Sequence, residues 1–279
     1  MDRKALPLVT INIPTYNQQG YIARAIESCL AQDYSNLEIV VSDDCSTDNT
    51  YHIAKKFESN KVRVHQTPQN SGRVKNYRYA LYELAKGEWV ANLDGDDYYN
   101  DAAFISIAVK QLSLHPSCVM YVGGAATLDE PTGKIQQAPI FLKENITGLK
   151  GTDYVLNFYK YGQVGQHFAV LYNRALALET DFYILDSLGS DTDSICRLAL
   201  KGDVLVQKKW VGVWTSHGAN VSYTLDMTGV EKELKMLEHI GEAARRYLPA
   251  ATVEKWLAES KRLKYKQALY ASLPSLSFG

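Results

Sequence analysis

Residues 37–48 read Leu-Glu-Ile-Val-Val-Ser-Asp-Asp-Cys-Ser-Thr-Asp, an apolar run that passes into a polar turn. The run predicts a buried strand, and the turn is rich in side chains that begin helices. The same succession recurs on both sides of this stretch. Strands are predicted at 8–13, 62–65 and 88–93, and helices at 21–32, from the turn to about Phe57, and at 73–85. Continuous apolar strands that alternate with helices are typical of an α/β fold, in which a mostly parallel sheet is flanked by helices.

The pattern loosens beyond residue 115. Strands are predicted at 119–127, 168–172, 204–207 and 211–214, helices at 154–160 and 191–200, and a long connection at 128–150. From Met227 onward the chain predicts two helices separated by Pro249. We therefore expect an α/β domain at 1–224 and a C-terminal helical extension at 225–279.

The composition excludes several classes of protein. The 279 residues include 30 Lys and Arg against 31 Asp and Glu, whereas a nucleic-acid binder normally carries a basic excess, so we expect no nucleic-acid partner. The four cysteines have no CxxC spacing, which favours free thiols over disulfides or a zinc site. No apolar run approaches the ~20 residues of a spanning helix, and the N-terminus does not resemble a signal peptide, so we expect a cytoplasmic protein.

Acidic residues follow two of the predicted strands. In sheets of this kind ligands bind beyond the carboxyl ends of the strands. Asp43 and Asp44 follow the second strand, and Asp94, Asp96 and Asp97 follow the fourth. Three carboxylates within four residues repel one another unless a cation lies among them, and Mg²⁺ and Mn²⁺ prefer oxygen ligands. The alternative is a solvated turn whose aspartates cap the next helix. Neither GxGxxG after the first strand nor GxxxxGK[ST] occurs, which disfavours the usual dinucleotide fold and a P-loop.

Four segments in the first hundred residues resemble motifs of the family 2 glycosyltransferases with the GT-A fold. PTYN at 14–17 is similar to the opening motif of that family. EIVVSDDCSTDNT at 38–50 resembles EIIVVDDGSTDGT, with Cys45 in place of the glycine, and NSG at 70–72 is similar to NxG. GEWVANLDGDD at 87–97 resembles GEYIxFLDxDD, which carries the DxD motif. The order and spacing of the four segments predict a GT-A fold, a Rossmann-like and mostly parallel sheet.

The resemblance implies a site for a nucleotide-sugar donor and a divalent cation, Mn²⁺ or Mg²⁺. Thr15 and Tyr16 would line the nucleotide pocket, and Asp43 would accept a hydrogen bond from the uracil of a uridine donor. Asp96 would bind the metal that bridges the two phosphates, with Asp97 as a further ligand or a supporting group. The donor-binding residues implied are Pro14, Thr15, Tyr16, Asn17, Asp43, Asn70, Arg73, Lys75, Asp94 and Gly95, with Asp44 as an additional candidate.

Two later segments extend the resemblance. GSDTDSICRL at 189–198 is similar to GEDxDLxxRL, in which the Asp after Glu is the catalytic base, and this implies that role for Asp191. Ser190 replaces the Glu, and the alternative is that Ser190 or Asp191 only caps a helix. WTSHGANVS at 214–222 resembles a segment whose His reaches the metal or the diphosphate, which implies His217. His167 lies where the family shapes its acceptor side.

The expected reaction is a direct displacement at the anomeric carbon of the sugar, with inversion. Asp191 would take the proton of an acceptor hydroxyl, and the metal would stabilise the leaving diphosphate. The family also implies a glycan or lipid-linked acceptor in surface polysaccharide assembly. The alternatives are a metal-dependent nucleotidyltransferase, which would normally show a basic glycine-rich loop after the first strand, and a non-catalytic nucleotide-sugar-binding protein.

The C-terminal helices suggest a second kind of contact. Lys255 to Leu273 combines basic and apolar residues in a pattern that fits an amphipathic helix on an anionic membrane surface. The alternative is a helix that packs on the catalytic domain or on a second subunit. Peripheral contact with the inner face of the membrane and homo-oligomerisation through these helices are both compatible with the sequence.

Overall fold

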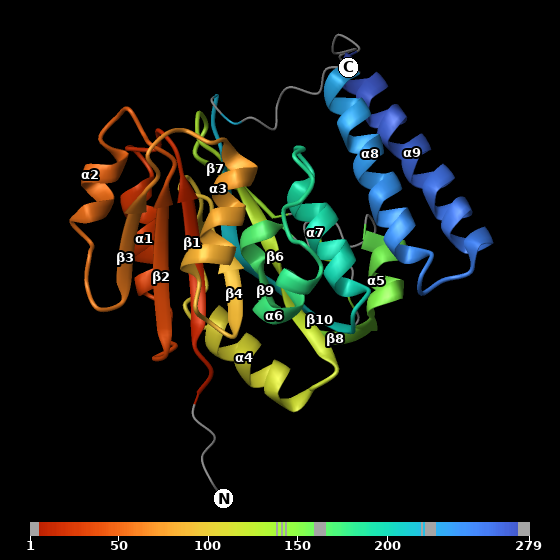
Figure 1. Ribbon diagram of the computed structural model, residues 1–279, viewed down its shortest axis with the longest axis horizontal. Helices are drawn as coiled ribbons and strands as arrows, with labels where there is room; N and C mark the ends of the chain where they lie inside the picture. The colour runs from red at the N-terminus through yellow and green to blue at the C-terminus, as the bar shows by residue number, and fades with distance from the viewer. Residues whose placement is uncertain are drawn as a thin grey trace, which may run out of the picture.

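The computed structural model describes residues 6–137, 139, 140, 142, 144–158, 166–218, 220 and 227–272. These residues form one mixed sheet with helices on both faces (Figure 1). Along the sheet the strand order is β3-β2-β1-β4-β9-β6-β10-β5, with β7 paired to β6 and β8 paired to β10. The strands are β1 (Val9–Thr15), β2 (Leu37–Asp43), β3 (Val62–Gln66), β4 (Trp89–Asn92), β5 (Tyr98–Tyr99), β6 (Cys118–Asp129), β7 (Lys134–Gln136), β8 (Ile146–Lys150), β9 (Val170–Asn173) and β10 (Asp203–Ser216).

The helices divide between the two faces of the sheet. They are α1 (Ile22–Leu30), α2 (Thr50–Lys55), α3 (Arg73–Tyr79), which continues as a π-helical turn (Ala80–Leu84), α4 (Phe104–Leu114), α5 (Gly151–Asn157), α6 (Arg174–Glu179), α7 (Ser190–Ala199), α8 (Met227–Ala244) and α9 (Ala250–Ser272). Apolar residues of α1, α2 and α4 join one buried cluster, and those of α3 and α5 to α9 join the other. In α1, for example, Ile22, Ala25, Ile26 and Cys29 form one buried stripe at helical spacing.

The topology brings several polar segments to one edge of the sheet. β1 pairs in parallel with β2 and β4, so the segments that follow these three strands meet at their carboxyl ends. β10 runs parallel to β6, and β9 runs antiparallel to both β4 and β6. The end of β10 and the start of β9 therefore lie at this same edge. A 3₁₀ turn (His167–Ala169) precedes β9 there.

The predicted alternation of strands and helices up to residue 97 is confirmed, with shifts of one or two residues at the ends. The second half differs more. The strands predicted at 204–207 and 211–214 are one strand, β10, whose pairing with β6 shifts register between Val206 and Gly212. The predicted connection at 128–150 contains β7 and β8, which are short and largely exposed. The helix predicted at 154–160 begins earlier, as α5, and residues 159 and 160 lie outside the described part of the chain.

The predicted helical extension is present as the hairpin of α8 and α9, and α8 packs against α7 (Figure 1). Met236, Leu237 and Ile240 of α8 and Trp256 and Leu257 of α9 belong to the same apolar cluster as α7. The first half of α9 therefore packs on the protein with its apolar face. The apolar residues predicted further along, Leu269, Tyr270 and Leu273, lie outside the side chains that the structure describes. The domain boundary at 224 and 225 remains a prediction.

Two further observations bear on the composition. Cys29, Cys45, Cys118 and Cys196 are all free thiols, as their spacing predicts. Within the described residues, no helix combines the length and the apolar character that crossing a membrane requires.

Candidate active site

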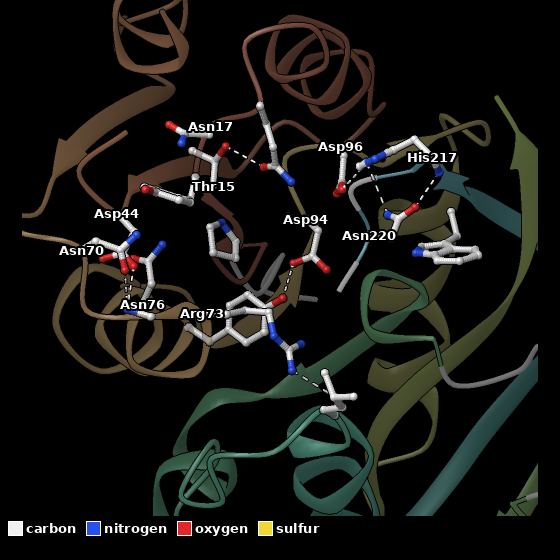
Figure 2. Close-up of a pocket in the computed structure, with 17 residues that line it drawn as sticks. Thr15, Asn17, Asp44, Asn70, Arg73, Asn76, Asp94, Asp96, His217 and Asn220 are labelled. Carbon is white, nitrogen blue, oxygen red and sulfur yellow. Dashed lines mark hydrogen bonds and ion pairs between the residues drawn. The ribbon is translucent and has the colours of Figure 1, made fainter. Parts of the chain in front are cut away.

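A cavity of about 540 Å³ opens at the carboxyl edge of the sheet. Figure 2 shows the arrangement: Asp44 and Asn70 lie at one end, Asp96 and His217 at the other, and Asp94 lies between them. The residues that line the cavity are Pro14, Thr15, Tyr16, Asn17, Gln18, Asp44, Asn70, Gly72, Arg73, Asn76, Tyr77, Asp94, Asp96, Leu188, Trp214, His217 and Asn220. They come from the ends of β1, β2, β4 and β10 and from the first turn of α3, so segments up to two hundred residues apart share one site.

The segment after β1 forms one wall. Asn17 has a left-handed backbone with φ 53°, and its side chain accepts a hydrogen bond from the amide of Thr47 at 2.8 Å. Thr15 donates to Gln18 at 2.7 Å, and the Tyr16 ring lies exposed at the cavity rim. Gly95, from the turn after β4, packs directly against Thr15 and Gln18. The sequence-predicted residues 14–17 therefore lie together at the cavity, and Gly95 supports them from behind.

Asp43 and Asp44 have different surroundings. Asp43 is fully buried, and its carboxylate accepts hydrogen bonds from Ser46 and from the side chain of Gln66 at 2.9 Å. It does not line the cavity. Asp44 does, and it accepts hydrogen bonds from the amides of Ser71 and Gly72, both at 2.9 Å. Asp44 therefore connects the loop at 70–72 to the end of β2 by hydrogen bonds. Asp43 stabilises the turn that contains Ser46, outside the cavity.

The first turn of α3 supplies a positively charged side chain, that of Arg73, to the cavity. Arg73 lines the cavity, and its Nη2 donates to the carbonyl oxygen of Ser187 at 2.9 Å. Its guanidinium lies 5.3 Å from the centroid of the Tyr77 ring, and Tyr77 donates to Asp94 Oδ1 at 2.6 Å. Lys75, also predicted to bind the donor, is exposed on α3 and is not part of the cavity lining.

Asp96 and His217 form the other end of the cavity. The Nε2 atom of His217 lies 3.0 Å from Oδ2 of Asp96, and the imidazole stacks on Tyr21 with 4.9 Å between ring centroids. Burial and the neighbouring Asp94 raise the pKa of Asp96, while His217 acts in the opposite direction. Asp97 faces away from the cavity: it is buried and accepts a hydrogen bond from the amide of Thr215 at 2.8 Å.

These residues fit a divalent cation that is shared with a ligand. Within the described residues, no group of three or more His, Cys, Asp and Glu side chains is arranged to hold a metal. Asp96 and His217 supply two donor atoms 3.0 Å apart. Adjacent ligands of an octahedral Mg²⁺, at bond lengths of about 2.1 Å, are separated by about 3 Å, and such ions usually take their remaining ligands from water and phosphate. A cation held by these two residues alone would take its remaining ligands from water or from phosphate oxygens.

Asp191 and His167, which the family resemblance implies for the acceptor side, do not line the cavity. Asp191 lies half-buried in the first turn of α7. Loss of water lowers the pKa of Arg73, but Tyr77, Asp191 and Asp94 raise it by more, so the guanidinium remains positively charged. His167 is buried, and its Nε2 lies 2.5 Å from the hydroxyl of Tyr183. Burial lowers the pKa of His167, so the ring is neutral. The ring packs against Tyr77, which lines the cavity.

Several lining residues were not predicted from the sequence. Tyr77 stands four residues after Arg73 on α3, and this spacing places both side chains on one face of the helix. Asn220 falls in the segment quoted for His217, and its amide donates to the carbonyl oxygen of Thr215 at 3.1 Å. Trp214 belongs to that same segment, whereas Gln18, Asn76 and Leu188 carry no signal in the sequence that would separate them from ordinary turn and core residues.

Comparisons with known proteins agree with this architecture. Over 223 residues the chain is 28% identical to a chondroitin synthase of Escherichia coli, an alignment that takes in 78% of this chain and 30% of that protein. The chain thus spans less than a third of the length of this curated relative. Among solved structures, residues 1–349 of TarS from S. aureus in complex with UDP-GlcNAc superpose with a TM-score of 0.73 at 24% identity, covering 93% of this chain and 73% of that one. The mannosyltransferase PcManGT from Pyrobaculum calidifontis, in complex with GDP-Man and Mn²⁺, gives 0.60 at 18% identity over 97% of this chain and 76% of that one.

These superpositions show the fold, which is GT-A. The family is shown by the sequence itself. Residues 10–175, more than half of the chain, match the family described as glycosyl transferase family 2. That stretch contains β1 to β4 and the acidic turn at Asp94–Asp97, which form most of the cavity. The chain belongs to glycosyl transferase family 2.

Proposed function

We propose that this protein is an inverting glycosyltransferase that moves a sugar from a UDP-sugar to a hydroxyl of a glycan or lipid-linked acceptor, in the assembly of a surface polysaccharide. One observation carries the proposal. A single cavity brings together the polar wall at 14–18, the Asp96–His217 pair and Arg73, whose guanidinium interacts with the charges of both Asp94 and Asp191. This arrangement offers one cavity in which the nucleotide base, the diphosphate and the reacting sugar of a donor can bind in that order.

The nucleotide occupies the end of the cavity near Asp44 and Asn70. The exposed Tyr16 ring provides a face for a base, and the oxygen and nitrogen atoms of Asn17, Asn70 and Asn76 offer hydrogen bonds to a base edge or a ribose. Asp94 lies beyond them, held by Tyr77. The complex of TarS with UDP-GlcNAc, a structure of the same fold, supports a uridine donor.

Asp96 and His217 would hold a divalent cation, Mn²⁺ or Mg²⁺, next to the diphosphate of the donor. A cation in this position stabilises the negative charge of the departing diphosphate. The Mn²⁺ and GDP-Man named for PcManGT support a metal in this fold. Arg73 is the protein's own positive charge at the cavity, and the carbonyl oxygens of Ser187 and Leu188 fix its guanidinium.

Asp191 is the general base. A sugar hydroxyl is a poor nucleophile at neutral pH, and a carboxylate that takes its proton during attack typically contributes ~10²–10⁴-fold to the rate. Asp191 is half-buried, and within the described part of the chain its carboxylate makes no hydrogen bond, so the carboxylate oxygens remain available to an acceptor. Arg73 lies close enough to Asp191 and to Asp94 for both charges to raise the pKa of its guanidinium.

Asp191→Asn and Asp96→Ala test the two roles separately. Asp191→Asn should reduce release of UDP from a UDP-sugar by ~10²-fold or more while UDP binding stays within about twofold of wild type. Asp96→Ala should abolish the strengthening of UDP binding by Mn²⁺, as EDTA does in the wild-type protein. A panel of UDP-, GDP- and dTDP-sugars identifies the substrate through nucleotide release, and isothermal calorimetry with UDP measures binding.

The exposed Asp186, in the loop that leads into α7, provides the matched control, since Asp186→Asn removes a similar charge from a residue that does not line the cavity. UDP binding that is indifferent to both EDTA and Asp96→Ala would refute the metal site. If no sugar nucleotide in the panel is turned over although UDP binds, the protein is a nucleotide-sugar-binding protein and not a transferase.

A further inference from the structure

We infer that helix α8 is part of the catalytic apparatus, and that His239 on it is a positioning residue for Asp191. This inference rests on the proposed role of Asp191 as the base. It assigns to the C-terminal hairpin a task that neither the motifs nor the cavity reveal, because none of the hairpin side chains that the structure describes lines the cavity.

The first contact lies at the N-terminus of α7. Gly189 comes directly before α7 and two residues before Asp191. It has no room for a side chain, because a Cβ atom there would collide with the sulfur of Met236 and lie 3.0 Å from a carboxylate oxygen of Glu233. Glu233 is itself buried and paired with Lys264 of α9 at 2.7 Å. Side chains of α8 therefore pack closely against the backbone at Gly189, directly before the helical turn that contains Asp191.

The second contact lies two residues after Asp191. Asp193 is fully buried, and its two oxygens are paired with Arg197 Nε at 2.9 Å and with His239 Nδ1 at 2.8 Å. A buried carboxylate is tolerated only when such partners satisfy it, so losing one partner is costly. Asp193 also belongs to the first turn of α7, where its amide donates to the carbonyl oxygen of Gly189 at 2.9 Å. His239 thus holds the same helical turn that carries Asp191.

Arg197 extends this connection to the loop between α6 and α7. Its terminal nitrogens donate to the carbonyl oxygens of Thr180 and Asp181, the latter at 3.0 Å. In this loop Asp181 and Tyr183 adopt left-handed backbones with φ 52° and 60°, which is strained for a residue as large as Tyr. Backbone strain of this kind persists only where the surroundings over-determine it.

Two arginines of α3 hold the loop from the opposite side. Arg78 donates to the carbonyl oxygen of Phe182 at 2.9 Å, and Arg73 donates to that of Ser187 at 2.9 Å. The loop and the first turn of α7 are therefore held between α3, which belongs to the donor site, and α8. His239 is the side chain of α8 that completes this arrangement by hydrogen bonding. Without it, Asp193 and the turn around it are free to shift, and a displacement of about 1 Å at a reacting group can cost ~10²-fold in rate.

Variants of His239 test the inference, and the half-exposed position of the side chain makes substitution feasible. His239→Leu and His239→Ala remove the hydrogen bond, whereas His239→Asn keeps an N–H donor near the place of Nδ1. Lys235→Ala changes an exposed residue of the same helix and is the matched control. Two measurements are made on the full chain: amide hydrogen exchange, and nucleotide release from UDP-GlcNAc with Mn²⁺, or from whichever donor of the panel the wild type turns over.

We expect amides in residues 180–193 to exchange faster in His239→Leu and His239→Ala, and those around 94–97 to be unchanged. The kcat for nucleotide release should fall about tenfold or more, with KM for the donor and the affinity for UDP within about twofold of wild type. His239→Asn should restore most of the kcat. A purely structural role would instead lower melting temperature, kcat and UDP affinity together, with no rescue by Asn.

The inference is overturned if exchange in 180–193 and kcat are both unchanged in His239→Leu and His239→Ala, or if Lys235→Ala has the same effect. Failure of the proposed function looks different. In that case the wild type releases nucleotide from no donor, and hydrogen exchange alone decides whether α8 controls the loop. If the His239 variants then exchange amides 180–193 at the wild-type rate, α8 does not control the loop. Faster exchange of these amides in the His239 variants would show that it does.

Discussion

At the scale of single residues, the site depends on close contacts that leave no space for a larger side chain. Gly95 is an example, because a Cβ atom there would lie 2.5 Å from Oε1 of Gln18 and 2.6 Å from Oγ1 of Thr15. Both of those side chains line the cavity. The absent side chain of Gly95 is therefore what allows the wall after β1 and the turn after β4 to approach each other.

Gly95→Ala should consequently reduce UDP affinity about tenfold and destabilise the protein by about 1–3 kcal/mol, the usual cost of overpacking. Chemical denaturation and calorimetry with UDP measure the two effects. Gly20→Ala is the control, because no atom lies within 4 Å of a Cβ built at Gly20, and its effect on stability should stay within about 0.5 kcal/mol. An unchanged UDP affinity in Gly95→Ala would contradict this account of the wall.

His239 leads to a second prediction at this scale, which concerns pH. The hydrogen bond to Asp193 raises the pKa of His239; burial opposes this, the charge of Asp193 adds to it, Arg197 of α7 lowers it and Glu242 of α8 raises it. Because the native pKa lies above the ordinary value of 6.5, protonated His239 stabilises the fold. That contribution is fully present below about pH 6.5 and is lost as the pH rises through the native pKa.

The free energy of unfolding of the wild type, minus that of His239→Asn, should therefore decrease between about pH 5.5 and pH 8.5. Urea denaturation at several pH values measures it, and the subtraction removes groups that titrate alike in both proteins. The side chain is partly exposed, so solvent screens the interaction and its size is modest. A difference that stays constant or grows with pH would show that protonation of His239 does not stabilise the fold.

At the scale of elements, the end of the cavity that contains Asp96 and His217 is built where α1, β10 and the turn after β4 meet. Arg24 of α1 lies beneath this junction. Its Nη2 donates to the carbonyl oxygen of Asp96 and to Oγ1 of Thr215, each at 2.8 Å. Its guanidinium packs 4.3 Å from the centroid of the Tyr98 ring. A single planar cation thus sets the distance between the strand that carries His217 and the turn that carries Asp96.

Arg24→Leu should weaken binding of UDP in the presence of Mn²⁺ by ~10–100-fold, the usual cost of losing a group that orients metal ligands. Binding of UDP in EDTA should change little, because Arg24 does not line the cavity. Arg24→Lys is the informative companion, since a lysine keeps the charge but cannot reproduce the fork of the guanidinium, and it should restore little of the affinity. Equal losses with Mn²⁺ and with EDTA would show instead that the whole cavity has been disturbed.

At the scale of the molecule, the part of the fold built from local signals was predictable, and the part built from distant contacts was not. The alternation up to residue 97 could be predicted because each strand and helix there carries its own apolar period. Asp43 and Asp44 show the limit: successive side chains at the end of a strand point to opposite sides, and only the sheet decides which side is the cavity. The contact of His239 with Asp193 spans 46 residues and leaves no local signal.

The whole-molecule arrangement also decides whether the chain is one folding unit or two. Leu237 of α8 is fully buried in the cluster that contains residues of β6, β9 and α7. Leu237→Ala should therefore lower the free energy of unfolding by about 2–5 kcal/mol, the usual cost of an aliphatic side chain removed from a core. If the hairpin and the sheet share one core, tryptophan fluorescence and far-UV circular dichroism should report a single, coincident transition that moves to lower denaturant.

The matched control is the exposed Glu231→Ala at the start of α8, which should leave the midpoint unchanged. Two separate transitions, of which Leu237→Ala shifts only one, would show that α8 and α9 unfold independently, and would place a domain boundary at residue 225.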